Sequence, residues 1–142
     1  AVGAPAAGWV SDRLGRRKPI LIAGSIIVCL MLCLLIFIPN LPLPAAVTIL
    51  IFIGFSGGSM ATSFALVRDV LPDRITGAAT GIVNALTVAS GAVLQPVVGM
   101  LLDLQAAGNT APYTDADFRL AFCVILVTAF AGLMVAFRLR EK

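Results

Sequence analysis

Four long apolar runs without a charged residue constrain the fold of this chain more than any other feature. They cover residues 19–39, 45–67, 75–102 and 120–137. A helix needs about 20 apolar residues to cross a bilayer, so each run is long enough to span one. An amphipathic helix of a soluble protein would instead carry charged residues on one face. The sequence therefore predicts an all-α fold, a polytopic membrane helix bundle.

The composition excludes several other classes of protein. Only 12% of the residues are charged, and the net charge of +3 is too small and too regularly placed to indicate binding to nucleic acid. The chain has no histidine, and its three cysteines lie inside the apolar runs, so we expect no metal site and no cofactor. We also expect no enzyme, because no acid pair or activated nucleophile stands in a plausible site.

The basic residues indicate how the runs alternate across the membrane. If each run crosses once, one side receives all but one of the ten Lys and Arg residues, at positions 13, 16, 17, 18, 68, 74, 138, 140 and 142. Only Arg119 falls on the other side, beside Asp115 and Asp117. Basic loops stay in the cytoplasm, so the sequence predicts cytoplasmic placement of this side, most simply in a bacterial inner (plasma) membrane.

A short polar turn precedes the first uncharged run. It reads G-x-x-x-D-R-x-G-R-R, with its fixed positions at Gly8, Asp12, Arg13, Gly15, Arg16 and Arg17. This spacing resembles the signature loop of the major facilitator superfamily of secondary transporters. The stretch 68–84 is also similar to a loop and helix start common in bacterial members of that family. The resemblance implies a transporter built from two six-helix halves.

The order of the segments resembles one end of such a half. Because the chain opens within an apolar run and ends in a basic tail, we expect the C-terminal part of a longer transporter, from the end of helix 8 through helix 12. Its partners would then be the missing N-terminal helices of the same transporter, the lipid bilayer and a small-molecule substrate. The alternative is helices 2 to 6. The expected segments are a helix end at 1–10, the cytoplasmic signature loop at 11–18, transmembrane helices at 19–39, 45–67, 75–102 and 118–138, and a cytoplasmic tail at 139–142.

Polar side chains are concentrated in the second and third runs. Ser56, Ser59 and Ser63 recur at three- and four-residue spacing, which places them on one helical face. Asn84, Thr87 and Gln95 fall on one stripe of the third run, and amides inside a membrane are costly unless they face water, substrate or a polar neighbour. We therefore expect these six residues to face the substrate or pore. The alternative is hydrogen bonding between helices.

Small residues in the same two runs predict close helix packing. Gly54 and Gly58 form one G-x-x-x-G pair, and Gly77 and Gly81 form another. The first and fourth runs carry almost no polar side chain and are expected to face lipid.

The signature loop also has a physical mechanism. Asp12 could meet the positive N-terminus of a helix from the other half while an arginine holds its carboxylate in place. Such a contact would latch the cytoplasmic side and favour the outward-open state, as the resemblance implies. The start of the third run, at Thr76 and Gly77, would dock the loop of the other half. The simpler alternative is a basic membrane anchor, which accounts for neither Asp12 nor the glycines.

The function expected from these features is transport of a small organic solute by alternating access, without a cofactor. The stretch 91–99 is similar to the family's antiporter motif but has Gln95 in place of a glycine, and Met100 replaces another. We therefore expect symport or uniport of a metabolite such as an amino acid or a sugar acid. The alternative is a non-transporting sensor or scaffold module built on the same bundle.

Overall fold

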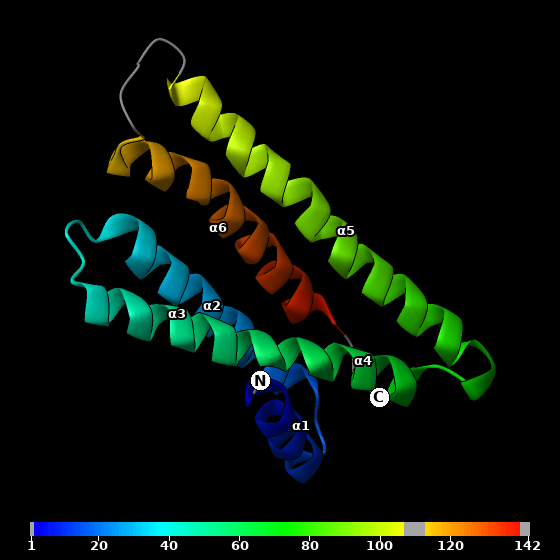
Figure 1. The fold of residues 1–142 in the computed structure, drawn as a ribbon. Coiled ribbons are helices and arrows are strands. Elements are labelled where there is room, and N and C mark those ends of the chain that lie inside the picture. The colour runs from blue at the N-terminus through cyan, green and yellow to red at the C-terminus, as the bar shows by residue number, and fades with distance from the viewer. Residues whose placement is uncertain (1, 107–112, 140–142) are drawn as a thin grey trace.

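The computed structural model describes residues 2–106 and 113–139, and all regular structure within them is helical (Figure 1). Its elements are α1 (Gly3–Leu14), α2 (Lys18–Phe37), α3 (Leu43–Gly57), the 3-10 turn η1 (Gly58–Met60), α4 (Ala61–Val70), α5 (Asp73–Ala106) and α6 (Asp115–Arg138). Among the described residues, four helical segments are long and apolar enough to cross a membrane: α2, the segment that runs from α3 through η1 to α4, then α5, and α6. The prediction of an all-α membrane bundle is confirmed.

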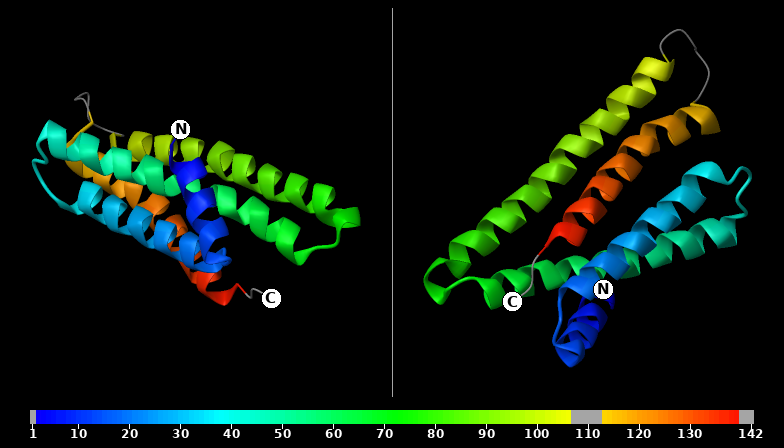
Figure 2. Two further views of the ribbon diagram at one scale, coloured as in Figure 1. Left: turned by 90° about the horizontal axis from the view of Figure 1, so that it is seen from below. Right: turned by 180° about the vertical axis from the view of Figure 1, so that it is seen from behind.

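The spanning helices have their basic ends together. The start of α2, the end of α4, the start of α5 and the end of α6 lie at one end of the bundle, opposite the connection from α2 to α3 (Figures 1 and 2). This end carries Arg17, Lys18, Arg68, Arg74 and Arg138, whereas Arg119 lies near the start of α6 at the opposite end. The arrangement agrees with the alternation inferred from the charges.

The signature loop is shorter than the sequence predicts. We expected residues 11–18 to form the loop, but α1 continues to Leu14 and the connection to α2 consists of residues 15–17. Gly15 ends α1 in the left-handed conformation, with φ 62°, and its N–H donates to the Asp12 carbonyl oxygen at 3.3 Å. Glycine adopts this conformation without steric strain. Asp12 therefore lies in the last turn of a helix.

Three of the four candidate spans are longer than the transmembrane segments that the sequence predicts, and only α2 is slightly shorter than its predicted segment. The second spanning segment covers Leu43–Val70 and is interrupted by η1, and α5 covers Asp73–Ala106 rather than 75–102. α2 begins at Lys18 and ends at Phe37. Residues 140–142 of the expected tail lie outside the described part of the chain, whereas Leu139 follows the end of α6.

The core of the chain lies between α2 and its neighbours. α2 packs against α3 on one side and α6 on the other, and Cys29, Ile36, Ile49 and Ala121 are among the buried apolar residues. α5 packs along α6 and meets α4 near their connection, but it makes no contact with α2 or α3 (Figure 1). None of the apolar window that defines its span is buried within this chain. Of the four candidate spans, α5 therefore has the least cover from the rest of the described chain.

The start of α6 is fixed by a capping box, and this gives a testable prediction. The Thr114 N–H donates to Asp117 Oδ2 at 2.7 Å, and the Asp117 N–H donates to Thr114 Oγ1 at 3.4 Å. Thr114→Ala should lower the free energy of unfolding by about 1 kcal/mol. Thr128→Ala, in the middle of α6, should change it by less than about 0.5 kcal/mol. Denaturant titration of the full-length protein in detergent measures both, and equal losses would contradict the role of the cap.

Candidate functional site

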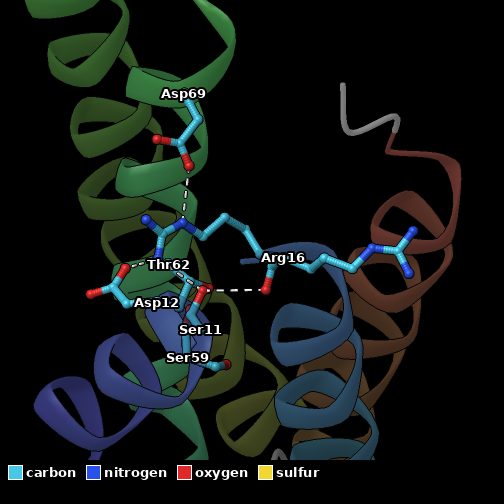
Figure 3. Close-up of polar contacts among 7 residues, drawn as sticks. Ser11, Asp12, Arg16, Ser59, Thr62 and Asp69 are labelled. Carbon is cyan, nitrogen blue, oxygen red and sulfur yellow. Dashed lines mark hydrogen bonds and ion pairs between the residues drawn. The ribbon is translucent and has the colours of Figure 1, made fainter. Parts of the chain in front are cut away.

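Arg17 joins the signature loop to the end of α4. Its Nε donates to Asp69 Oδ2 at 3.0 Å, and its Nη1 donates to Ser11 Oγ at 3.0 Å and to Asp12 Oδ1 (Figure 3). The Ser11 hydroxyl in turn donates to the Arg16 carbonyl oxygen at 3.4 Å. We refer to Ser11, Asp12, Arg17 and Asp69 as the loop cluster. It ties three segments together, α1, the residue before α2, and α4.

The ion pairs of the loop cluster orient the Asp12 carboxylate and add little to the free energy of unfolding. The two carboxylates raise the pKa of Arg17, chiefly because its guanidinium donates a hydrogen bond to Asp12 and then because it donates one to Asp69, so the guanidinium stays charged. However, the Asp12 side chain is 67% exposed and the Asp69 side chain 52%. Ion pairs this exposed contribute little to the free energy of unfolding. What the cluster does fix is the direction of the Asp12 carboxylate.

The remaining residues of the signature motif do not join this cluster. The Arg13 guanidinium lies 5.2 Å from the centre of the Trp9 ring, a cation–π contact on the exposed side of α1. The Arg16 side chain points away from the cluster (Figure 3). Gly8 has no atom within 4 Å of the position a Cβ would take.

The sequence analysis identified Asp12 and Arg17 as motif residues but did not identify Ser11 and Asp69 as their partners. Nothing in the local sequence pattern shows which distant acidic residue contacts the loop.

Close packing occurs where α1 crosses the segment from α3 to α4. A Cβ on Gly58 would lie 2.2 Å from the Gly3 carbonyl carbon, and a Cβ on Gly3 would lie 2.2 Å from the Phe55 carbonyl oxygen. Gly58 is thus at a close contact within the chain. Gly54, Gly77 and Gly81 have open space around them, so their role in packing stays a prediction that concerns helices outside this chain.

A cleft of about 720 Å³ opens between α2, the segment from α3 to α4, α5 and α6. Four of the predicted polar residues line it: Ser56, Ser59 and Ser63 from one side and Thr87 from α5. Ser25 and Ser90 also line it and were not among the predicted site residues. Apolar residues from α6 and α2 form much of the remaining wall. We call this feature the hydroxyl cleft.

Most hydroxyls of the cleft donate their proton to their own helix. Thr87 Oγ1 donates to the Val83 carbonyl oxygen at 2.8 Å, and Ser25 Oγ donates to the Leu21 carbonyl oxygen at 2.8 Å. Ser63 and Ser90 donate in the same way, each to the carbonyl three residues earlier. Their lone pairs are left as acceptors. Ser56 differs, because its buried Oγ has no hydrogen-bond partner in the structure and can still donate.

Asn84 and Gln95 do not line this cleft. Both side chains are exposed on α5, and neither has a side-chain hydrogen bond within the described residues. Of the predicted stripe on α5, only Thr87 reaches the cleft. The structure thus brings Thr87 and the serines together and leaves the two amides apart. No group of three His, Cys, Asp or Glu side chains that could hold a metal occurs among the described residues.

Comparison with known proteins gives one clear similarity. A family model described as Major Facilitator Superfamily matches residues 1–142, the whole chain. Searches of curated proteins and of solved structures gave no match. The family model covers the loop cluster and the hydroxyl cleft alike.

Proposed function

Because the chain belongs to the Major Facilitator Superfamily, whose members are membrane transporters, we propose that it forms part of a secondary transporter for a small organic solute. The hydroxyl cleft is the observation that supports this proposal beyond the family match, because polar groups from three spanning segments, α2, the segment from α3 to α4, and α5, face one space. Transport would proceed by alternating access, as symport or uniport. We place the basic end of the bundle in the cytoplasm and expect the remaining helices from the same transporter.

The chemistry of the cleft favours a solute that donates hydrogen bonds. Thr87, Ser25, Ser63 and Ser90 offer acceptor lone pairs, and among the described residues no charged side chain lines the cleft. Hydroxyl or amide N–H groups of a metabolite suit such acceptors. The carboxylate of an amino acid or a sugar acid would need a cation beyond the described lining of the cleft, since an unpaired charge in the membrane is costly.

The loop cluster supports a mechanical role for the signature motif. Arg17 orients the Asp12 carboxylate, which lies at the basic end of the bundle, the end at which α5 also begins. A carboxylate at this end can meet the positively polarised N-terminus of a helix from the other half. We assign Asp12 to a latch that holds the cytoplasmic side closed. The exposed start of α5, at Gly77, would receive the equivalent loop of the other half.

Removing one hydroxyl from the cleft tests the proposed solute site. Thr87→Val keeps the shape of the side chain but removes an acceptor, so we expect the KM for transport to rise about three- to ten-fold with little change in kcat. Thr128→Val is the matched control, because its hydroxyl donates to the Ile125 carbonyl oxygen from an exposed part of α6. Uptake by the full-length protein in proteoliposomes measures both.

Two results of this experiment would contradict the proposal at different levels. An unchanged KM for Thr87→Val would remove the cleft from the solute path while leaving transport intact. An absence of saturable flux for any small metabolite would favour the alternative function, a membrane sensor or scaffold.

A further inference from the structure

Ser11 lies between Arg17 and the backbone of the signature loop. It stands one residue before Asp12 near the end of α1, and although it is polar it is fully buried. Its Oγ accepts a hydrogen bond from Arg17 Nη1 at 3.0 Å and donates one to the Arg16 carbonyl oxygen at 3.4 Å (Figure 3). Because Ser11 lies outside the fixed positions of the signature motif, the motif itself gives it no role.

The hydrogen bonds of Ser11 determine what it can offer to Arg17. Its single proton is directed to the Arg16 carbonyl oxygen, so toward Arg17 the hydroxyl acts only as an acceptor. Arg17 Nη1 carries two N–H groups and has two acceptors, Ser11 Oγ and Asp12 Oδ1. Together with the bond from Nε to Asp69, these two contacts hold the planar guanidinium in one orientation.

The three acceptors that Arg17 has among the described residues are not held equally firmly. The Asp12 side chain is 67% exposed and the Asp69 side chain 52%, so water competes with both carboxylates for the guanidinium. Ser11 is buried and its hydroxyl is bound to a loop carbonyl, so water does not compete at this contact. Ser11 is therefore the fixed point to which the guanidinium is bound.

From this geometry we propose that Ser11 is a positioning residue for the latch, which sets the direction of the Asp12 carboxylate through Arg17. The inference rests on the proposed function, in which Asp12 acts as the latch. Without the Ser11 oxygen, one N–H group of Arg17 Nη1 loses its acceptor and turns toward water, and the exposed Asp12 carboxylate moves with it. Ser11 does not occur among the described residues that line the hydroxyl cleft, so it acts on the latch and not on the solute.

Ser11→Ala in the full-length protein tests this role. We expect the initial rate of uptake into proteoliposomes to fall about five-fold, the effect of losing one hydrogen bond. Loss of the latch favours the inward-open state, so a thiol introduced by Thr87→Cys, in a background without other reactive cysteines, should become more accessible from the cytoplasmic side. Ser11→Cys has a side chain of similar shape but a weaker acceptor, and it should lower the rate in the same direction.

Thr62→Val is the matched control for the loss of a buried hydroxyl. Thr62 is buried like Ser11, but its hydroxyl donates to the Ser59 carbonyl oxygen and not to the loop cluster. The rate of uptake and the accessibility of the introduced thiol should therefore stay unchanged. Equal losses in Thr62→Val and Ser11→Ala would indicate that lost packing around buried hydroxyls slows transport, and would overturn the positioning role.

A double variant with Arg17→Gln shows whether Ser11 acts through Arg17. Once Arg17 is replaced, Ser11→Ala should cause no further loss in rate, because its effect passes through that residue. A full additional loss in the double variant would overturn the positioning role. Normal transport by Ser11→Ala, together with slow transport by Arg17→Gln, would also overturn it but would leave the latch intact. If both single variants transported normally, the latch itself would fail, and the role of Ser11 with it.

Discussion

Gly58→Ala should lower the free energy of unfolding by roughly 2–3 kcal/mol, a large effect for a single methyl group. A Cβ on Gly58 would lie 2.2 Å from the Gly3 carbonyl carbon and 2.4 Å from the Ala4 nitrogen. Both are backbone atoms, so no rotamer change relieves the clash and α1 must move away. Denaturant titration of the full-length protein in detergent measures the loss, and proteolysis near residue 14 should become faster as α1 separates.

Gly54→Ala is the matched control for this prediction. Gly54 lies one turn earlier on the same segment and has no atom within 4 Å of its Cβ position. Alanine favours a helix over glycine by up to about 1 kcal/mol, so this variant should be neutral or slightly more stable. If Gly54→Ala destabilised the protein as much as Gly58→Ala, the crossing of α1 would not be the cause.

This contrast between two glycines shows what the sequence could predict about the fold. The uncharged runs predicted four spanning helices, and the described residues contain four helices long and apolar enough to cross a membrane, because a bilayer requires long apolar segments regardless of tertiary contacts. The G-x-x-x-G spacing named both Gly54 and Gly58 but could not show which one meets another helix. That contact depends on Gly3, more than fifty residues earlier, and on the direction in which α1 crosses.

For the hydroxyl cleft, the sequence likewise predicted which residues share a helical face but not which face each helix turns toward the cleft. Helical spacing placed Ser56, Ser59 and Ser63 on one face, and the structure finds them in one cleft with Thr87. The same spacing grouped Asn84 and Gln95 with Thr87, yet α5 turns only part of that stripe toward the cleft. The rotation of a helix about its axis is set by packing, and α5 packs only on α6 and near α4. Its amides stay a prediction for helices outside this chain.

Arg17→Gln should lower the initial rate of transport roughly ten-fold or more, while leaving the unfolding midpoint nearly unchanged. The ion pairs of Arg17 are too exposed to add much stability, but they fix the direction of the Asp12 carboxylate. A latch that shifts a two-state equilibrium couples sites by about 1–3 kcal/mol, which is about 5- to 150-fold. Uptake into proteoliposomes at equal protein content measures the rate, and Asp12→Asn should act in the same direction.

Arg68→Gln is the control that separates a specific contact from loss of charge. Arg68 precedes Asp69 on α4, is exposed and has no ion pair among the described residues, so its variant should transport normally. Adding Asp69→Asn to Arg17→Gln should then cause little further loss, because one interaction can be removed only once. If the losses in transport rate from Arg17→Gln and Asp69→Asn were additive in the double variant, the result would count against the latch. A cysteine introduced by Thr87→Cys gives a second test, which measures the accessibility of its thiol from each side of the membrane. An accessibility that Arg17→Gln leaves unchanged on both sides would also count against the latch. A ten-fold loss in Arg68→Gln would instead indicate that total basic charge, and not the geometry of the loop cluster, controls transport.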